Sequence, residues 1–351
     1  MSVKSYKCPA CGAGIGFDIE SQAWSCKFCG SEYTEDTLRG SQPPEEENAS
    51  VSPADNVPRD AFENAVLFSC PSCGGEILSD EHTAATFCLY CHNPAILSSR
   101  VSGEYRPAML IPFRKPKEEA LAALKKYCRR RPLLPKDFLR YAEKGEIGGL
   151  YVPFWLFDAD LCADLQAEGT RIKTWSDRKY RYTRTDYYAV RRVADVTFLR
   201  VPADGSSRMD DMLMDQLEPF HYEELKDFDP AFLSGHLAER YDIDAQTCSG
   251  RALQRMRQAS EHSVRDTVNG YSGVRVQRFS ARAARLRSIY AMLPVWVLMG
   301  DYRGKRYTFA MNGQTGKIAG RLPMSFARAM AWLGITGLGA AALAFLGMML
   351  L

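Results

Sequence analysis

Eight cysteines in the first hundred residues constrain the fold of this chain more than any other feature of its sequence. They form two copies of one pattern, C-x2-C-x14-C-x2-C, and each cysteine of the second copy lies 62 residues after its counterpart. Two residues between cysteines let a tight turn aim both sulfurs at one point, and four thiolates at about 2.3 Å satisfy a tetrahedral Zn2+. The pattern therefore predicts two zinc ribbons. Their ligands are Cys8, Cys11, Cys26 and Cys29 in the first, and Cys70, Cys73, Cys88 and Cys91 in the second.

Other uses of these cysteines are less well supported. A disulfide framework needs an oxidising compartment, yet Met1 to Lys4 begin no apolar signal-peptide run. The C-x-x-C-H sequence of covalent haem attachment ends at His92, but the first copy has Gly30 at that place. Iron in a rubredoxin-like site uses the same four-thiolate geometry and stays open. Each ribbon is too short to bury a core, so metal binding is expected to supply most of its folding free energy, about 10–16 kcal/mol per site.

The C-terminus predicts a transmembrane helix. Residues 329–351 contain no charged side chain, and a helix of that length is about 34 Å long, enough for a hydrocarbon core of about 30 Å. Arg321 and Arg328 stand just before the run, and Trp332 lies at interface depth. By the positive-inside rule the preceding domains are cytoplasmic. The chain is therefore expected to be tail-anchored, or part of a longer membrane protein.

The remaining sequence divides into an expected linker and an α+β domain. Residues 1–35 form ribbon one and residues 62–100 form ribbon two. Residues 36–61 are polar and contain prolines but few apolar residues, which predicts a flexible linker that lets the ribbons move independently. Residues 101–325 are predicted to form a mixed, mainly antiparallel α+β domain. Its expected helices are 116–129, 137–144, 209–217, 229–241 and 252–268, and its expected strands are 148–158, 170–192, 196–201, 273–279, 288–300, 305–311 and 315–320.

A loose internal repeat indicates two related halves in this domain. Pro153 and Trp155 stand in one apolar strand, and Pro294 and Trp296 stand in another. Because proline cannot donate a ladder hydrogen bond, both strands are expected at sheet edges or to begin there. The repeat fits an aromatic ligand groove or, with better support, a core built from two halves. Asn312–Gly313 favours a type I′ turn before the last strand.

No catalytic constellation is apparent, so we expect a protein that is not an enzyme. The sequence from Gly313 to Lys317 lacks the glycine spacing and the serine or threonine of a phosphate-binding loop. His236 is expected to be packed or exposed rather than a base, and the aspartates near Asp210 are expected to form a solvated acidic face. Residues 251–287 hold nine arginines. A solvated basic face is the favoured interpretation, with phosphate contacts to nucleic acid or lipid headgroups as the alternative.

The order of these motifs resembles a bacterial family, the TFIIB-type zinc-ribbon membrane proteins, which carry a primosomal-helicase-like label because of their ribbons. The motifs that match are the two ribbons, Ile111–Phe113, Gly149–Asp158, Leu293–Trp296, Asn312–Lys317, Leu322–Pro323 and the closing apolar helix. The resemblance implies a membrane anchor encoded beside a flotillin-like (SPFH) protein and phage-shock protein A. It also implies a single-pass protein of the cell inner membrane that acts in envelope-stress response.

Together these observations predict a membrane-anchored adaptor that holds two structural Zn2+ ions and docks cytoplasmic protein partners at the inner membrane face. The expected partners are flotillin-like or phage-shock-protein-A-like proteins, by resemblance, together with membrane lipid. A membrane-associated zinc-ribbon protein that binds nucleic acid is the alternative function. Oligomerisation stays open.

Overall fold

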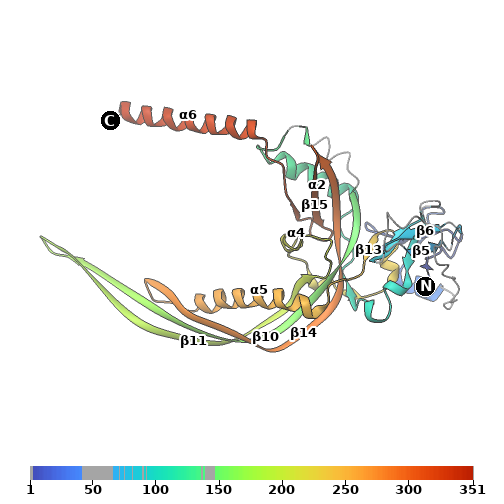
Figure 1. The fold of residues 1–351 in the computed structure, drawn as a ribbon, viewed down its shortest axis with the longest axis horizontal. Coiled ribbons are helices and arrows are strands. Elements are labelled where there is room, and N and C mark those ends of the chain that lie inside the picture. The colour runs from blue at the N-terminus through green and yellow to red at the C-terminus, as the bar shows by residue number, and fades with distance from the viewer. Residues whose placement is uncertain are drawn as a thin grey trace.

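Two 30-residue strands run side by side through the protein and organise the rest of the chain. The computed structural model describes residues 3–41, 66–70, 72–74, 76–80, 82–88, 91, 93–135, 137–138 and 147–350. Strand β10 (Ile147–Ser176) pairs antiparallel with β14 (Gly273–Tyr302), from Ile147 opposite Leu298 to Thr170 opposite Gly273. This pair is the centre of an 11-stranded sheet (Figure 1).

The other strands flank this central pair. On the β10 side lie β11 (Arg181–Asp204), β13 (Leu237–Glu239), β7 (Thr83–Phe87), β8 (Pro94–Leu97) and β1 (Val3–Lys4). On the β14 side lie β15 (Lys305–Asn312), β16 (Ile318–Gly320), β9 (Met109–Leu110) and β12 (Lys226–Asp227). Two small sheets contain β2 (Gly16–Asp18), β3 (Ala23–Ser25) and β4 (Glu32–Tyr33), and β5 (Val66–Ser69) with β6 (Glu76–Ser79).

Five α-helices lie in the described part of the chain: α1 (Glu35–Ser41), α2 (Lys117–Arg129), α4 (Asp211–Gln216), α5 (Ala245–Asp266) and α6 (Phe326–Leu350). Short 3-10 turns are η1 (Ser98–Arg100), η2 (Gly103–Tyr105), η3 (Tyr222–Glu224) and η4 (Pro230–Leu233). The chain therefore has the mixed α+β fold that its sequence predicts.

Both faces of the sheet are covered in the body of the protein. On β14 the side chains of Ala291, Met292, Leu293 and Val295 are fully buried. They point alternately into two cores, one on each face of the sheet. Met292 and Trp296 pack toward α2, whereas Leu293 and Val295 pack toward α4. Successive side chains of a strand point to opposite faces, so a strand covered on both faces reads as a continuous apolar run.

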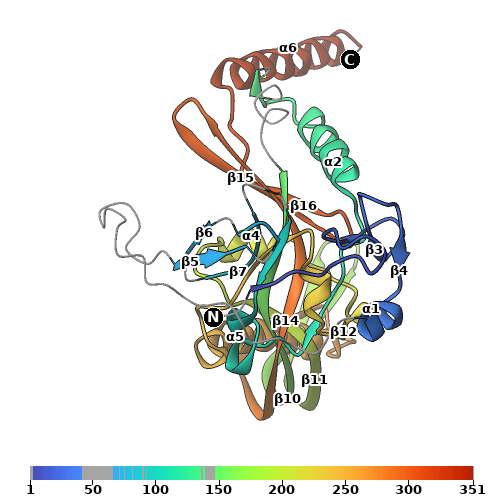
Figure 2. The ribbon, with the colours of Figure 1, turned by 90° about the vertical axis from the view of Figure 1, so that its right-hand side faces the viewer.

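The outer halves of β10, β11 and β14 form a long curved arm that leaves the body (Figure 1). Its concave face is covered by α5, against which Leu161, Ala163 and Leu165 of β10 are buried. The intervening residues Cys162 and Gln166 are exposed, as the alternation of a strand covered on one face requires. Figure 2, a view along the arm, shows α6 and the arm at opposite ends of the body.

The strands with Pro-x-Trp are central, so the prediction that they lie at sheet edges is wrong. The carbonyl oxygens of Pro153 and Pro294 accept hydrogen bonds from Gly205 and Gly313, both at 2.8 Å. In a strand the nitrogen and the carbonyl of one residue point to the same side. On that side of Pro153 the neighbouring strand changes from β13 to β11, and on that side of Pro294 it changes from β9 to β15. No ladder hydrogen bond is lost at either proline, because each marks a change of neighbouring strand. Both indoles pack in the core: Trp155 donates to the Ile243 oxygen at 2.9 Å and Trp296 to the Lys115 oxygen at 2.8 Å.

The first cysteine ribbon packs on the body, which contradicts the expectation that the ribbons move independently. Trp24 donates to the Ala231 oxygen at 2.8 Å, and the Phe17 amide donates to the Ser234 oxygen at 2.8 Å. Strand β1 pairs with β8 of the second ribbon, whose β7 pairs with β13. The expected linker begins with α1, and its residues 42–61 lie outside the described residues.

Most predicted helices and strands are present, with different lengths. The helices expected at 116–129, 209–217 and 252–268 are confirmed as α2, α4 and α5, while that at 137–144 falls mostly outside the described residues. The strands expected separately between 148 and 201, and between 273 and 300, merge into β10, β11 and β14. The turn with two successive positive φ angles is Arg303–Gly304, so the type I′ prediction for Asn312–Gly313 is wrong.

The helix expected at 229–241 is also wrong. The N-terminal signal is present, since Asp229 caps η4 by accepting from the Ala231 amide at 2.9 Å. The helix ends after one 3-10 turn because Ser234 bonds to the first ribbon and Gly235 turns with φ of 97°. The chain then continues into β13.

Helix α6 contains residues 329–350 of the apolar C-terminal run, and beyond its first turn it projects away from the body (Figure 1). Met330, Trp332 and Leu333 are 53%, 47% and 65% exposed. Among the residues that the structure describes, no helix is both long enough and apolar enough to cross a bilayer. The description of α6 side chains ends at residue 340.

Candidate metal centres

Each predicted set of four cysteines comes together in the fold. The sulfurs of Cys8, Cys11, Cys26 and Cys29 all lie within 4.8 Å of one another, and so do those of Cys70, Cys73, Cys88 and Cys91. The pairing distances are 3.5 Å for Cys8–Cys29 and 3.6 Å for Cys11–Cys26. In a tetrahedral site with metal–sulfur bonds of about 2.3 Å, sulfurs lie about 3.8 Å apart. Both sets could therefore hold a metal ion with little rearrangement.

The second centre has the same geometry. Cys70–Cys91 and Cys73–Cys88 are both separated by 3.7 Å between sulfurs. Its buried cysteines pack with Phe68, Ala95 and Leu97 in a small separate core. In each centre the first and third cysteines are buried, while the second is exposed. One side of each site therefore faces the protein and the other faces solvent.

Hydroxyl groups surround the thiols of the first centre. The Tyr33 hydroxyl lies 3.2 Å from the Cys8 sulfur, and this hydrogen bond lowers the pKa of the Cys8 thiol to about 6. The Ser31 hydroxyl lies 3.2 Å from the Cys29 sulfur and lowers the pKa of that thiol as well. Groups of this kind favour the thiolate form, which is the form that binds metals. This chemistry, together with the sulfur spacing, fits a four-thiolate metal site.

Local turns explain why the cysteines converge. In three of the four knuckles the residue after the second cysteine of the turn is a glycine with a positive φ, namely Gly12, Gly30 and Gly74. The amide of each donates to the carbonyl of the cysteine that opens its knuckle, as Gly12 does to Cys8 at 2.8 Å. Such a conformation favours glycine, which has no Cβ. This geometry depends only on residues near in sequence, so the spacing alone predicted it.

The first centre presents an exposed aromatic side chain that the sequence analysis did not single out. Phe28 stands between Cys26 and Cys29 and is 83% exposed, the highest value among the large apolar side chains whose exposure the structure describes. Its neighbours Lys27 and Cys29 are also exposed. A metal-bound knuckle would hold this phenylalanine outward on a rigid support.

Three further cysteines, Cys128, Cys162 and Cys248, lie outside the two motifs, and a free cysteine of this kind is expected to be a small buried side chain. This holds for Cys128 and Cys248, which are buried, and burial raises the pKa of each thiol to about 11. Cys162 is exposed on the convex face of the arm, so the expectation is wrong there. None of the three joins a metal-binding group in the described part of the chain.

His236 was expected to be either packed or exposed, and the structure shows that it is packed in the core. Its ring stacks on Phe113 with 4.4 Å between ring centroids, and burial lowers its pKa to about 4. The unfolded chain, with an ordinary histidine pKa of about 6.5, binds a proton at a higher pH than the folded chain does. Stability from this residue is therefore present above pH 6.5 and falls as the pH decreases from 6.5 toward 4.

This difference predicts a specific pH dependence. Between pH 7 and pH 5 the wild-type protein should lose about 2 kcal/mol more free energy of unfolding than the variant His236→Phe, which cannot titrate there. Urea unfolding at both pH values measures the difference, and the contributions of the cysteine centres cancel because both proteins contain them. Equal losses in the two proteins would show that His236 is not the cause.

The glycine-rich turn from Asn312 to Lys317 is a structural connector. The Asn312 side chain is fully buried; it accepts from the amides of Gln314 and Thr315 at 2.9 Å and donates to the Leu217 oxygen at 3.0 Å. Gln314 donates to the His221 oxygen at 3.1 Å. These bonds hold the segment after α4 against the sheet.

The arginine-rich stretch divides into two structural groups. Arg251 and Arg255 of α5 form ion pairs inside the protein, Arg251 with Asp204 and Asp211 and Arg255 with Glu218 at 2.7 Å. Asp211, which belongs to the acidic face expected on α4, is therefore in an ion pair with Arg251. On β14 three of the five exposed arginines stand opposite carboxylates of β10: Arg275 opposite Glu168, Arg285 opposite Asp160 and Arg287 opposite Asp158. Cross-strand pairs of opposite charge favour the interpretation of a solvated charged face.

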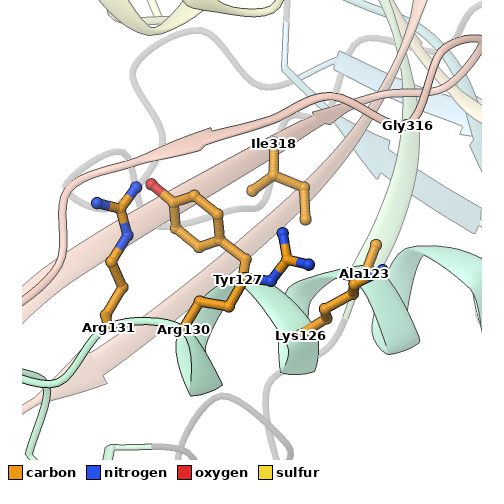
Figure 3. Close-up of a pocket in the computed structure, with 7 residues that line it drawn as sticks. All are labelled: Ala123, Lys126, Tyr127, Arg130, Arg131, Gly316 and Ile318. Atoms are coloured by element: carbon orange, nitrogen blue, oxygen red, sulfur yellow. The ribbon is translucent and has the colours of Figure 1, made fainter.

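A basic groove lies at the C-terminal end of α2 (Figure 3). It has a volume of about 480 Å³ and is lined by Lys126, Tyr127, Arg130 and Arg131 on one side and by Gly316 and Ile318 on the other. The Arg131 guanidinium lies 4.9 Å from the centroid of the Tyr127 ring. Among the described residues, none that lines the groove carries a carboxylate.

This groove adjoins the start of α6. The Ser325 amide donates to the Leu133 oxygen at 2.9 Å, and Arg328 donates to the Leu134 oxygen. The end of α2 therefore places a cluster of cations where α6 leaves the body.

The fold and its two cysteine clusters define a mixed α+β protein with two four-thiol sites able to hold metal ions. Uncharacterized protein YdjG of Bacillus subtilis (strain 168) is 35% identical to this chain over 335 residues, which is 95% of this chain and 94% of that protein. The chain belongs to the same family as YdjG. No family model and no solved structure matches it.

Proposed function

We propose that this protein is a non-enzymatic adaptor, anchored in the cell inner membrane by α6, whose two Zn2+-binding ribbons dock cytoplasmic proteins in an envelope-stress response. The observation that carries the docking role is Phe28, 83% exposed on a knuckle whose cysteines belong to a four-thiol site. Exposed aromatic side chains on a rigid support are typical anchors of protein interfaces.

The anchoring role is supported by α6 and by what surrounds its start. The helix continues for 25 residues, about 38 Å, longer than a hydrocarbon core of about 30 Å. Its sequence from residue 329 onward has no charge. Lys126, Arg130 and Arg131 in the basic groove stand beside its start, where cations favour the cytoplasmic side and anionic lipid headgroups.

The partners are proposed from the resemblance stated above: a flotillin-like protein and a phage-shock-protein-A-like protein. Phe28→Ala should lower their recovery with the purified protein in mild detergent by about tenfold or more, since truncating an interface anchor costs at least about 2 kcal/mol. Quantitative mass spectrometry of the co-purified proteins measures the effect. Leu199→Ala, which removes a side chain 71% exposed on β11, is the matched control.

Two outcomes would count against this function. Equal recovery of both partners by wild type, Phe28→Ala and Leu199→Ala would remove the docking role of the first ribbon. Recovery of neither partner by the wild-type protein would remove the partner assignment. The nucleic-acid alternative has less support than the sequence suggested, because Arg251 and Arg255 are used in internal ion pairs.

A further inference from the structure

The tip of the arm combines aromatic and basic side chains that the proposed adaptor function does not use. We define the arm tip as residues 171–188, where β10 and β11 extend as a two-stranded hairpin beyond the start of β14. These 18 residues contain six basic, two acidic and five aromatic side chains. All residues from 171 to 182 are exposed.

Both carboxylates of the arm tip are already engaged. Asp177 accepts from the amides of Lys179 and Tyr180 at 2.8 Å and from the Tyr182 hydroxyl at 3.0 Å, and these bonds lower the pKa of its carboxyl. Asp186 pairs with Arg184 at 2.8 Å. Within the described residues, five cations of the arm tip form no ion pair. Arg171 is held by a hydrogen bond to the Gly270 oxygen at 3.0 Å, which leaves four unpaired cations: Lys173, Arg178, Lys179 and Arg181. The tip therefore holds more cations than its own carboxylates can pair with.

The aromatic side chains are held in place yet remain exposed. Trp175 stacks on Tyr182 across the hairpin, with 5.7 Å between centroids and 17° between planes. Trp175, Tyr180 and Tyr187 are nevertheless 52%, 64% and 67% exposed. A rigid hairpin that shows indole and phenol rings beside unpaired lysines and arginines matches the headgroup region of a bilayer, where tryptophan and tyrosine concentrate and cations meet anionic lipids.

The arrangement of the molecule allows the arm tip and α6 to reach one surface. The arm curves toward the side on which α6 lies (Figure 1). Trp175 is an even number of positions from Leu161 and Leu165, which face α5, so strand alternation places the Trp175–Tyr182 pair on the same concave face. In Figure 1 one plane can be drawn through the start of α6 and the arm tip. This plane leaves α6 on one side and leaves α5, the arm and the cysteine ribbons on the other.

We propose that the arm tip is a second membrane contact, which binds an anionic phospholipid surface through Trp175, Tyr180 and Tyr182 and the four unpaired cations. The inference that the arm tip and α6 meet one bilayer rests on the proposed anchoring by α6. The inference that the arm tip binds anionic lipid rests on its own side chains. Two points of attachment would fix the orientation of the cytoplasmic domains and hold the ribbons at a set height above the bilayer.

Tryptophan fluorescence of the full-length protein tests the two contacts separately. Trp24 and Trp296 are buried, so Trp332→Phe leaves Trp175 as the exposed reporter, and Trp175→Phe leaves Trp332. The double variant gives the background from Trp24, Trp155 and Trp296. Each protein is reconstituted with vesicles that contain brominated phosphatidylcholine, with or without phosphatidylserine, at low and high salt.

In Trp332→Phe we expect lipid quenching above background on vesicles with phosphatidylserine, and its loss at high salt or on neutral vesicles. Adding Lys173→Gln, Arg178→Gln, Lys179→Gln and Arg181→Gln should return the quenching to background. The matched control removes four exposed arginines of β14 instead (Arg275→Gln, Arg282→Gln, Arg285→Gln and Arg287→Gln) and should keep the quenching.

The outcomes separate this proposal from the anchor. Quenching of Trp332 without quenching of Trp175 would support the anchor and overturn the arm-tip contact. Quenching of Trp175 without quenching of Trp332 would support the arm tip and overturn the anchor. Quenching of Trp175 by a single-stranded oligonucleotide, with none by anionic vesicles, would assign the arm tip to nucleic acid and overturn the proposal.

Discussion

Cys26→Ser should remove one metal ion per chain and unfold the first ribbon together with its contacts to the body. Three thiolates cannot complete a closed tetrahedral site, and binding of a structural zinc contributes about 10–16 kcal/mol in small zinc-dependent domains. The ribbon contributes Ile15, Phe17 and Trp24 to the largest core, so we expect the effect to extend beyond residues 3–41. Elemental analysis gives the metal content, and thermal unfolding gives the loss of stability.

Cys162→Ser is the matched control for this experiment, because it removes an exposed thiol that belongs to no four-cysteine group. It should keep the wild-type metal content and melting temperature. Removal of both metal ions from the wild-type protein with a chelator should lower its melting temperature at least as much as Cys26→Ser does. Full metal content and unchanged melting in Cys26→Ser would show that the first cluster does not depend on metal for its fold.

Phe232→Ala should lower the free energy of unfolding by about 3–5 kcal/mol, the range for truncating a buried phenylalanine. Phe232 is fully buried, and its ring lies 5.1 Å from Phe17 and 4.9 Å from Trp24 between centroids. It is thus the main apolar contact of η4 with the first ribbon. The substitution should mainly weaken the packing of the first ribbon on the body. Amide hydrogen exchange in residues 15–24 should therefore increase more than in β10 and β14.

Phe28→Ala provides the comparison for Phe232→Ala. It removes the same number of atoms from a ring that is 83% exposed, so its free energy of unfolding should change little. Urea unfolding of both variants at constant metal content measures the two effects. A small loss for Phe232→Ala, equal to that of Phe28→Ala, would mean that the ribbon is held by its hydrogen bonds and strands alone.

Local features of this protein followed from its sequence. The spacing of the cysteines predicted both sets of ligands, because a knuckle is set by two intervening residues and a glycine turn. Helix α2 was predicted from apolar residues at helical spacing, which a helix needs wherever it packs, and most of α5 was predicted as a helix as well. Asp229 and Pro230 correctly marked the start of a helix. The helix ends after one turn because Ser234 bonds to the first ribbon.

Long-range features did not follow from it. In the arm β10 pairs with β14 through residues more than a hundred positions apart, such as Leu165 with Phe279. The length of these strands depends on such partners rather than on local propensity. The sequence of the arm tip, in which aromatic and basic residues alternate between Arg171 and Arg184, could have indicated its chemistry. Its exposure could not have been predicted without knowing where α5 and β14 end.

The sequence by itself determined which eight cysteines form the two sites, since each pair converges through a turn of a few residues. Only the tertiary structure decided that the first ribbon is part of the main core. The contacts responsible join Phe17 and Trp24 to Phe232, more than two hundred residues away. Spacing within a motif sets local geometry, whereas the surface against which the motif packs is chosen by the whole chain.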